Sequence, residues 1–180
     1  MDLFKKQQKL KPYFETAYGC AVFEQVAKAG FGIGGAGGNG EVYVFGKGKD
    51  NVKKVGGSTL LQVSFGFQFG GQVFSEIIFF ASQKDFENFT QENFEFSADA
   101  NVVALNASAS AKVSTMGNQS ITVGMSPDKM ELGYDSCQYT NGMAVFTVAL
   151  GGLMYEATVS GQKFTYKPTD GTPAVETVTE

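Results

Sequence analysis

The sequence contains no histidine, no arginine and no tryptophan. Without histidine, no side chain titrates near neutral pH unless its surroundings shift its pKa. The chain therefore supplies neither a Ser-His-Asp or Cys-His catalytic centre nor a histidine-ligated metal site. Without arginine, no guanidinium can bind phosphate in a bidentate manner, so lysine side chains and backbone N–H groups must hold any anion. These absences favour a binding or structural protein over an enzyme.

Cysteines and long apolar runs are also scarce. Cys20 and Cys137 allow either one disulfide or two free thiols. No segment reaches the roughly 18 apolar residues that a membrane-spanning helix needs. Met1 leads directly into Asp2 and a lysine-rich stretch, which is not the pattern of a secretory signal. We expect a cytosolic protein or one whose export signal has been removed.

The charge is distributed unevenly along the chain. Residues 1–54 contain nine lysines and five acidic residues, whereas residues 55–180 contain five lysines and thirteen acidic residues. An acidic body argues against a general nucleic-acid-binding protein. The basic N-terminal end is suited to contact with an anionic surface, and a solvated charged helix is the alternative interpretation.

The N-terminal segment, residues 1–18, has a helical pattern. Its apolar and basic side chains fall on opposite faces of a helical wheel, with Leu3, Leu10 and Phe14 opposite Lys5 and Lys9. Pro12 interrupts a continuous helix but suits the first turn of a second short one, which would end before Gly19. The sequence predicts a kinked amphipathic segment that either docks on the core or contacts a membrane.

The most informative stretch is residues 58–80, STLLQVSFGFQFGGQVFSEIIFF. Apolar residues alternate with small or polar ones, with Val63, Phe65, Phe67 and Phe69 on one parity and Ser64, Gly66, Gln68 and Gly70 on the other. This period of two predicts a strand whose phenylalanine face is buried. Gly70 and Gly71 interrupt the pattern, so we expect one long bent strand or two strands that meet at a corner.

Residues 30–40 form the glycine-rich run GFGIGGAGGNG, which matches the pattern G-x-G-x-x-G at Gly30, Gly32 and Gly35. A dinucleotide site requires a helix after this pattern. Residues 41–45 instead have a strand pattern, and no Walker lysine follows, so nucleotide binding is excluded. We interpret the run as strands whose glycines, Gly34 included, allow close backbone approach and strong curvature.

The rest of the chain predicts one helix and several strands. Ser82 and Asp85 form a capping pattern for a helix over residues 83–92 that buries Phe86 and Phe89. Residues 94–113, rich in alanine and serine, and residues 121–125 are strand candidates, and residues 127–139 are a polar connection. Residues 141–164 hold the last strands, with a turn at Ser160 and Gly161.

Taken together, these patterns predict a mainly β (α+β) fold. We expect a strongly curved antiparallel sheet or a closed barrel, with a helical N-terminus and one short helix near residues 83–92. The predicted organisation is a helical segment at 1–18, a β-rich domain at 19–167 and a flexible acidic tail at 168–180.

Glu76 is the one candidate for acid–base chemistry. Ser75 lies beside it and Gln72 four residues earlier. Successive strand residues face opposite sides, so Ser75 and Glu76 cannot form a simple nucleophile–base pair. A buried, hydrogen-bonded glutamate is more often architectural, and we expect Gln72 or backbone N–H groups to hold it.

Four phrases of the sequence together resemble the SYLF domain. They are AYGCAVF at 17–23, KAGFGIGGAGGNG at 28–40, GFQFGGQVFSEIIFF at 66–80 and GGLMYEATVSGQKF at 151–164. The resemblance implies a lipid-binding module, because eukaryotic members bind phosphoinositides through a basic amphipathic N-terminal segment and some bundle actin filaments. It further implies a structural role for the motif residues, which are Gly30, Gly32, Gly34, Gly35, Gly70, Gly71, Gln72, Ser75 and Glu76.

The chain is most similar to the bacterial single-domain type of this family, whose members are often exported. The resemblance therefore implies a periplasmic or cell-envelope location with the signal removed, although a cytoplasmic one stays open. Cys20 occupies a position that is usually aromatic in the family, and export would favour a disulfide between Cys20 and Cys137.

The resulting hypothesis is a non-enzymatic module that binds anionic phospholipid without a cofactor, a metal, a nucleotide or nucleic acid. Its contact residues would be Leu3, Phe4, Lys5, Lys6, Lys9, Leu10, Lys11 and Phe14. The apolar members would enter the headgroup region while each lysine contributes about 1 kcal/mol at an anionic surface. The alternative is a structural or protein-interaction module of the envelope, with actin binding less favoured.

Overall fold

The computed structural model describes residues 1–46, 51–91, 94–96, 102–105 and 138–169. Three long strands dominate this part of the chain: β1 (Gly19–Phe45), β2 (Val52–Phe80) and β5 (Met143–Pro168). They form an antiparallel sheet in the order β1-β2-β5-β3, in which β3 (Phe94–Phe96) also pairs with β5. The short strand β4 (Val102–Leu105) runs parallel to β5. The predicted mainly β fold is confirmed, as a curved sheet rather than a closed barrel.

The four helical segments lie at the ends of strands. The N-terminal segment consists of α1 (Asp2–Lys5), the 3-10 turn η1 (Gln8–Leu10) and α2 (Lys11–Thr16), and α3 (Gln83–Thr90) follows β2. Pro12 lies in the first turn of α2, as predicted from its missing N–H group. The Ser82 hydroxyl accepts a hydrogen bond from the Asp85 N–H group at 3.3 Å, so the predicted cap of α3 is confirmed.

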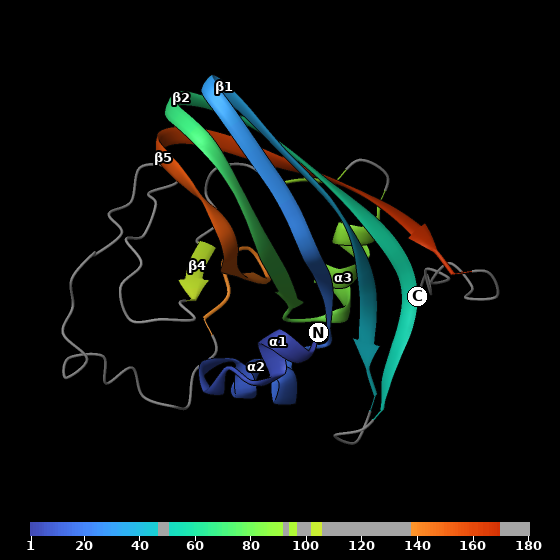
Figure 1. Ribbon diagram of the computed structural model, residues 1–180. Helices are drawn as coiled ribbons and strands as arrows, with labels where there is room; N and C mark the ends of the chain where they lie inside the picture. Colours follow the sequence, from blue (N-terminus) through green and yellow to red (C-terminus); the bar gives the residue numbers. More distant parts are fainter. Residues whose placement is uncertain (47–50, 92–93, 97–101, 106–137, 170–180) are drawn as a thin grey trace.

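The long strands bend sharply, so that the sheet folds over itself into two layers (Figure 1). One layer, which we call the helix-covered layer, contains residues 19–29, 71–80 and 143–150. The other, the bare layer, contains residues 33–45, 52–65 and 161–168. The bend between them carries Gly32 and Gly70, whose φ angles of 73° and 122° lie in the left-handed region that side chains disfavour.

The two halves of β1 approach each other closely. A Cβ atom on Gly38 would lie 2.6 Å from the Gln25 carbonyl oxygen, and one on Gly40 would lie 2.6 Å from the Val22 carbonyl oxygen. These contacts leave no space for a side chain at either position. The glycine-rich run therefore serves close backbone approach and curvature, as the sequence predicts.

Two apolar clusters hold the molecule together. The first lies between the two layers and includes Phe23, Leu60 and Phe164, together with Phe86 and Phe89 of α3. The second lies on the outer face of the helix-covered layer, beneath the N-terminal helices. The run Ile77 to Phe80 is apolar throughout because its alternate side chains enter these two clusters in turn.

Of the two predicted alternatives for residues 58–80, one long bent strand is confirmed, since they all belong to β2. Elsewhere the strand boundaries differ from prediction in two places. Residues 20–23 and 41–45 are parts of one continuous β1, because the ladder with β2 continues through bulges at Phe23/Val26 and Phe31/Ile33. The predicted turn at Ser160 and Gly161 is wrong, since these residues pair with Ser64 and Val63 in an unbroken ladder. The strand candidate at 121–125 and the tail from residue 170 lie outside the described residues.

Candidate functional site

The N-terminal segment is docked on the sheet through its apolar side chains. Phe4 and Leu10 are fully buried in the second cluster, and Leu3 and Phe14 are partly buried against it. The ring of Phe14 contacts that of Phe79 edge-on, with centroids 4.9 Å apart. The terminal amine of Met1 forms an ion pair with Glu24 at 2.9 Å. Of the two alternatives, the structure shows the docked one, and Phe4 and Leu10 are not available to enter a headgroup region.

The lysines of this segment face solvent. Lys5, Lys6, Lys9 and Lys11 are all exposed, and they lie on α1, η1 and α2 at the end of the molecule opposite the bend (Figure 1). The apolar face is thus used for docking while the basic face is exposed. The structure brings the four lysines together on one short segment, as their spacing predicts.

The glycines singled out by the sequence gather at the bend. Gly30 pairs with Gly70 and Gly71 with Ala29, while Gly34 and Gly35 pair with Ser64 and Val63 at the start of the bare layer. Among these, Gly32 and Gly70 have positive φ angles. Their common role is to let β1 and β2 turn at the same level.

The buried face of β2 in the bare layer is the reverse of the predicted one. Val63, Phe65 and Phe69 are exposed, while the polar side chains of Gln62 and Ser64 are buried. The side chain of Phe67 lies outside the described part of the structure. The predicted alternation is present, but the side chains predicted to face the interior face outward. A period of two does not say which parity faces inward.

Inward-facing side chains of β2 and β5 form a buried polar cluster between the layers. The side-chain amide of Gln162 donates to Glu76 Oε2 at 3.1 Å and to Gln62 Oε1 at 3.2 Å. Glu76 Oε1, Gln62 Nε2 and Ser58 Oγ have no hydrogen-bond partner among the described residues. Burial raises the pKa of Glu76 to about 7, and the Gln162 hydrogen bond partly opposes the rise.

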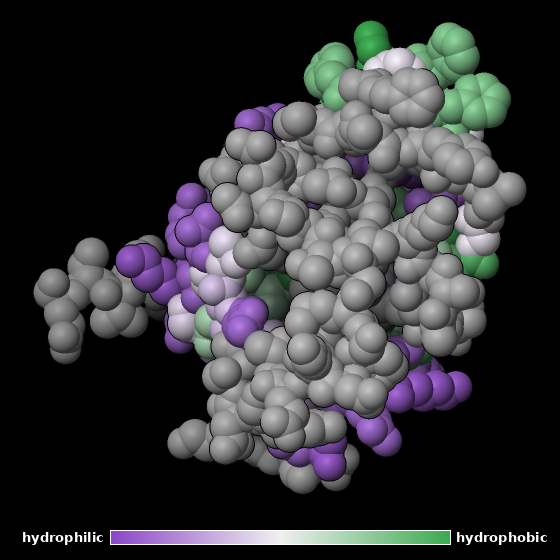
Figure 2. Space-filling view, turned by 90° about the vertical axis from the view of Figure 1, so that its left-hand side faces the viewer, coloured by the Kyte–Doolittle hydropathy of each residue, from purple (hydrophilic) through white to green (hydrophobic). Residues whose placement is uncertain are grey.

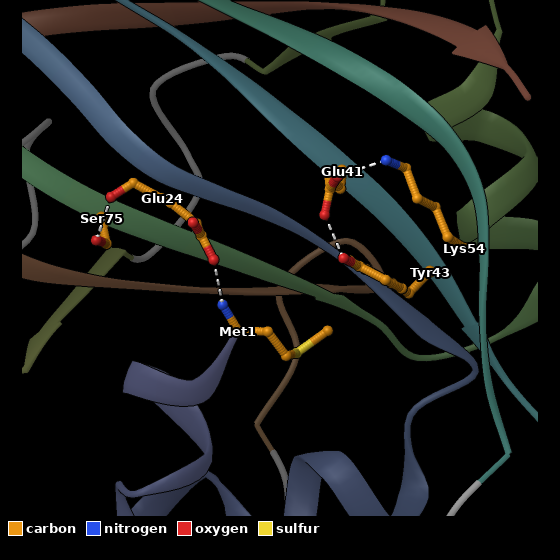
Figure 3. Close-up of polar contacts among 6 residues, drawn as sticks. All are labelled: Met1, Glu24, Glu41, Tyr43, Lys54 and Ser75. Carbon is orange, nitrogen blue, oxygen red and sulfur yellow. Dashed lines mark hydrogen bonds and ion pairs between the residues drawn. The ribbon is translucent and has the colours of Figure 1, made fainter.

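The predicted partner of Glu76 was wrong. Gln162 of β5 holds its carboxylate, and Gln72 lies nearer the bend on the same strand as Glu76. Ser75 and Glu76 do face opposite sides, because the Ser75 hydroxyl donates to the Glu24 carbonyl oxygen at 2.6 Å on the other face (Figure 3). The cluster ties the two layers together through side chains of β2 and β5.

A second polar group lies on the outer face of the bare layer. Glu41 accepts hydrogen bonds from Tyr43 and from Lys54 across the β1–β2 ladder (Figure 3). The Lys54 contact, and then that of Tyr43, hold the pKa of Glu41 below its usual range. Glu41 and Lys54 are about half exposed and Tyr43 is partly buried against the second cluster, so this group stabilises the strand pair.

The described part of the chain has few features that would support metal binding or thiol chemistry. No group of three potential metal ligands occurs there. Cys20 is a free thiol that is fully buried, and burial raises its pKa. Its predicted partner, Cys137, lies outside the described residues. Among the helices that the structure describes, none has the length and apolar character needed to cross a bilayer.

Comparison with known proteins decides the family. Residues 61–169 match the family Ysc84, described as "Las17-binding protein actin regulator". The chain belongs to the Ysc84 family. The matched region, which is the SYLF domain, covers more than half of the chain and includes the bend of β2, α3 and the whole of β5.

One curated relative also belongs to the Ysc84 (SYLF) proteins. Beta cell expansion factor A of Aeromonas veronii is 26% identical over 162 residues, which cover 90% of this chain and 51% of the relative. The chain therefore spans about half the length of this relative. The Ysc84 family is one of binding and regulatory domains, some of which bind lipid.

Proposed function

We propose that this Ysc84-family chain is a non-enzymatic module that binds anionic phospholipid surfaces through its basic N-terminal segment. The observation that supports this function is the exposure of Lys5, Lys6, Lys9 and Lys11 on a segment whose apolar side chains are docked. A docked segment presents its lysines from a fixed platform, so little conformational entropy is lost when they contact headgroups.

Burial of Phe4 and Leu10 changes the mechanism that the sequence suggests. The lysines act by electrostatic attraction, and no apolar side chain of this segment enters the bilayer. Each lysine contributes about 1 kcal/mol near an anionic surface, and this contribution falls with distance over a Debye length of ~8 Å at physiological salt. Binding through this segment is therefore weak, reversible and sensitive to salt.

Vesicle co-sedimentation tests this proposal. Wild-type protein is expected to sediment with vesicles of phosphatidylcholine and phosphatidylglycerol at low salt, and to dissociate as salt is added. The variant Lys5→Glu/Lys6→Glu/Lys9→Glu/Lys11→Glu is expected to lose the salt-sensitive part of binding. A matched control is Lys84→Glu/Lys167→Glu, because both lysines are exposed but lie elsewhere. Unchanged binding of the quadruple variant would sink the electrostatic mechanism.

The second candidate is a structural or protein-interaction module of the cell envelope. The edge strand β1 favours it, since β1 pairs only with β2 in the described part of the sheet. An edge strand can accept a strand from a partner. Recovery of one stoichiometric protein partner, with no vesicle binding by the purified chain, would select this candidate. Both candidate functions include the proposal that the protein is exported. Fractionation of the cells that express it tests this location.

A further inference from the structure

The exposed apolar side chains of the molecule are concentrated at one end. We call six of them the bend surface: Phe31, Ile33, Leu61, Val63, Phe65 and Phe69, which are 51–82% exposed. Val73 and Leu150 flank them at 37% and 47%, and the one large exposed hydrophobic side chain elsewhere in the described residues is Val52. Figure 2 shows hydrophobic side chains projecting together at one end of the molecule.

The bend surface lies in a part of the sheet with little charge. Residues 29–40 of β1 and residues 55–75 of β2 contain no charged residue, and β5 contains only Glu156 between Met143 and Lys163. The outer face of the bare layer becomes polar away from the bend, first at the Thr59–Asn39 hydrogen bond and then at the Lys54–Glu41 ion pair. The surface thus changes from apolar to charged along one direction, as a partner with an apolar interior and a polar boundary requires.

The alternation of apolar and polar side chains along β2 is a separate indication of what surrounds the bend surface. Along residues 61–65 the apolar side chains point outward, and Gln62 and Ser64 point inward toward the buried polar cluster. A strand that faces water on one side normally places its apolar parity in the core. Apolar side chains outside and polar ones inside are the arrangement of strands that face lipid.

The shape of the bend distinguishes a fluid medium from a protein partner. Ile33 and Phe65 pair on the outer face of the bare layer, and the rings of Phe31 and Phe69 meet at 6.0 Å beside them. Val73 lies on the opposite outer face, since it shares the parity of Ile77 and Phe79. The exposed side chains therefore diverge around a convex turn. A rigid partner can cover one side of such a turn, whereas acyl chains can cover all of it.

We propose that the bend surface enters the hydrocarbon boundary of a phospholipid bilayer and is the apolar anchor of this protein. This inference rests on the proposed lipid-binding function but not on the lysines. The basic N-terminal segment lies at the other end of the molecule (Figure 1), so the two contacts are independent. The bend contributes the salt-resistant part of binding, and the lysines contribute the salt-sensitive part.

The absence of tryptophan allows a direct test with a single reporter. In the Phe65→Trp variant, the indole stands on the bend surface. In the matched control Val52→Trp, it stands at an exposed position at the far end of the same strand. Vesicles of phosphatidylcholine alone, with acyl chains brominated at known depths, quench only an indole that enters the hydrocarbon. We expect a blue shift and quenching for Phe65→Trp, and neither for Val52→Trp.

Removal of the anchor is the complementary experiment. The variant Phe31→Thr/Phe65→Thr/Phe69→Thr keeps strand-forming residues and removes three exposed rings. We expect about tenfold weaker partitioning into phosphatidylcholine vesicles, or more, since burial of even one phenylalanine is worth roughly that factor. Val63→Thr is expected to weaken partitioning, whereas Val52→Thr is not. Urea unfolding of each variant checks that the fold is intact.

The outcomes separate the anchor from the proposed function. Salt-sensitive sedimentation with anionic vesicles, together with an unquenched Phe65→Trp indole, overturns the anchor and leaves the function standing. No sedimentation of wild-type protein with any vesicle overturns both. A wild-type dimer in sedimentation velocity that the triple variant lacks, with unchanged vesicle partitioning, assigns the bend surface to a second copy of the chain and overturns the anchor.

Discussion

The helix-covered layer and the bare layer are built from the same three strands, yet their side chains are distributed in opposite ways. In the helix-covered layer both faces are apolar and buried, as Ile77 and Ile78 show on successive positions. In the bare layer the outer face near the bend is apolar and exposed, as Val63 and Phe65 show, while Gln62 and Gln162 lie on the inner face. The N-terminal segment covers the outer face of the helix-covered layer, and in the described part of the chain it reaches the bare layer at Phe45, the end of β1 away from the bend.

The comparison teaches that phenylalanine content does not identify the core of this protein. Phe79 and Phe65 lie on one strand and have the same parity, but Phe79 is fully buried and Phe65 is 59% exposed. The two rings should therefore contribute different amounts to the unfolding free energy. Three predictions test such contrasts, from the largest expected effect to the smallest.

Truncation of Phe79 should break the helix-covered layer. Its ring contacts Tyr13, Phe14 and Phe146, so Phe79→Ala removes fully buried contacts and is expected to cost about 3–5 kcal/mol of unfolding free energy. Phe65→Ala, at an exposed position of the same strand, is expected to change it by less than about 0.5 kcal/mol. Urea unfolding of the two variants measures both values, and equal losses would contradict the contrast between the layers.

The buried carboxylate should make stability depend on pH. Burial raises the folded-state pKa of Glu76 from 4.5 to about 7, so folding favours the protonated form. The stability that this group lends is complete below pH 4.5, is lost as pH rises to 7 and stays lost above it. The loss is at most about 3 kcal/mol.

Glu76→Gln sharpens this prediction, because the amide has a similar shape and no charge. The variant is expected to be more stable than wild type above pH 7 and to lack the wild-type decline between pH 4.5 and 7. Unfolding curves at the two ends of this range provide the measurement. A wild-type decline that persists in the variant would assign the titration to another group.

Two neighbouring glycines test the close approach within β1. Gly38→Ala places a Cβ atom 2.6 Å from the Gln25 carbonyl oxygen, and a backbone atom cannot move aside cheaply. We expect a loss of about 1–3 kcal/mol. Gly37→Ala is the control, because its nearest neighbour would be the Leu60 carbonyl oxygen at 3.7 Å. Thermal unfolding should show a lower Tm for the first variant and an unchanged or slightly raised Tm for the second.

Part of the candidate site was predictable from local sequence. The lysines of the N-terminal segment and its docking residues follow from helical spacing, and the cap of α3 follows from Ser82 and Asp85. The buried state of Glu76 was predicted as well. Its partner was not, because Gln162 lies 86 residues away and meets Glu76 only after the sheet has folded over.

The bend surface was missed although its sequence signal was present. Residues 55–75 contain no charge, which marks a segment that avoids water on at least one side. The alternation predicts that the phenylalanine parity faces the core, since that is the usual arrangement of a half-buried strand. Two strands of opposite phase have the same period, so periodicity alone could not reveal the inversion.

The sequence by itself determined the strand-rich composition, the glycines at which the strands bend, the cap of α3 and the position of the basic segment. Each of these depends on a residue's own backbone preference or on neighbours within a few positions. Only the tertiary structure decided which face of β2 is inside, what holds Glu76 and which apolar side chains stay exposed. Those outcomes depend on how two layers of one sheet fold together and on which outer face the N-terminal segment covers, and contacts between residues far apart in the chain decide both.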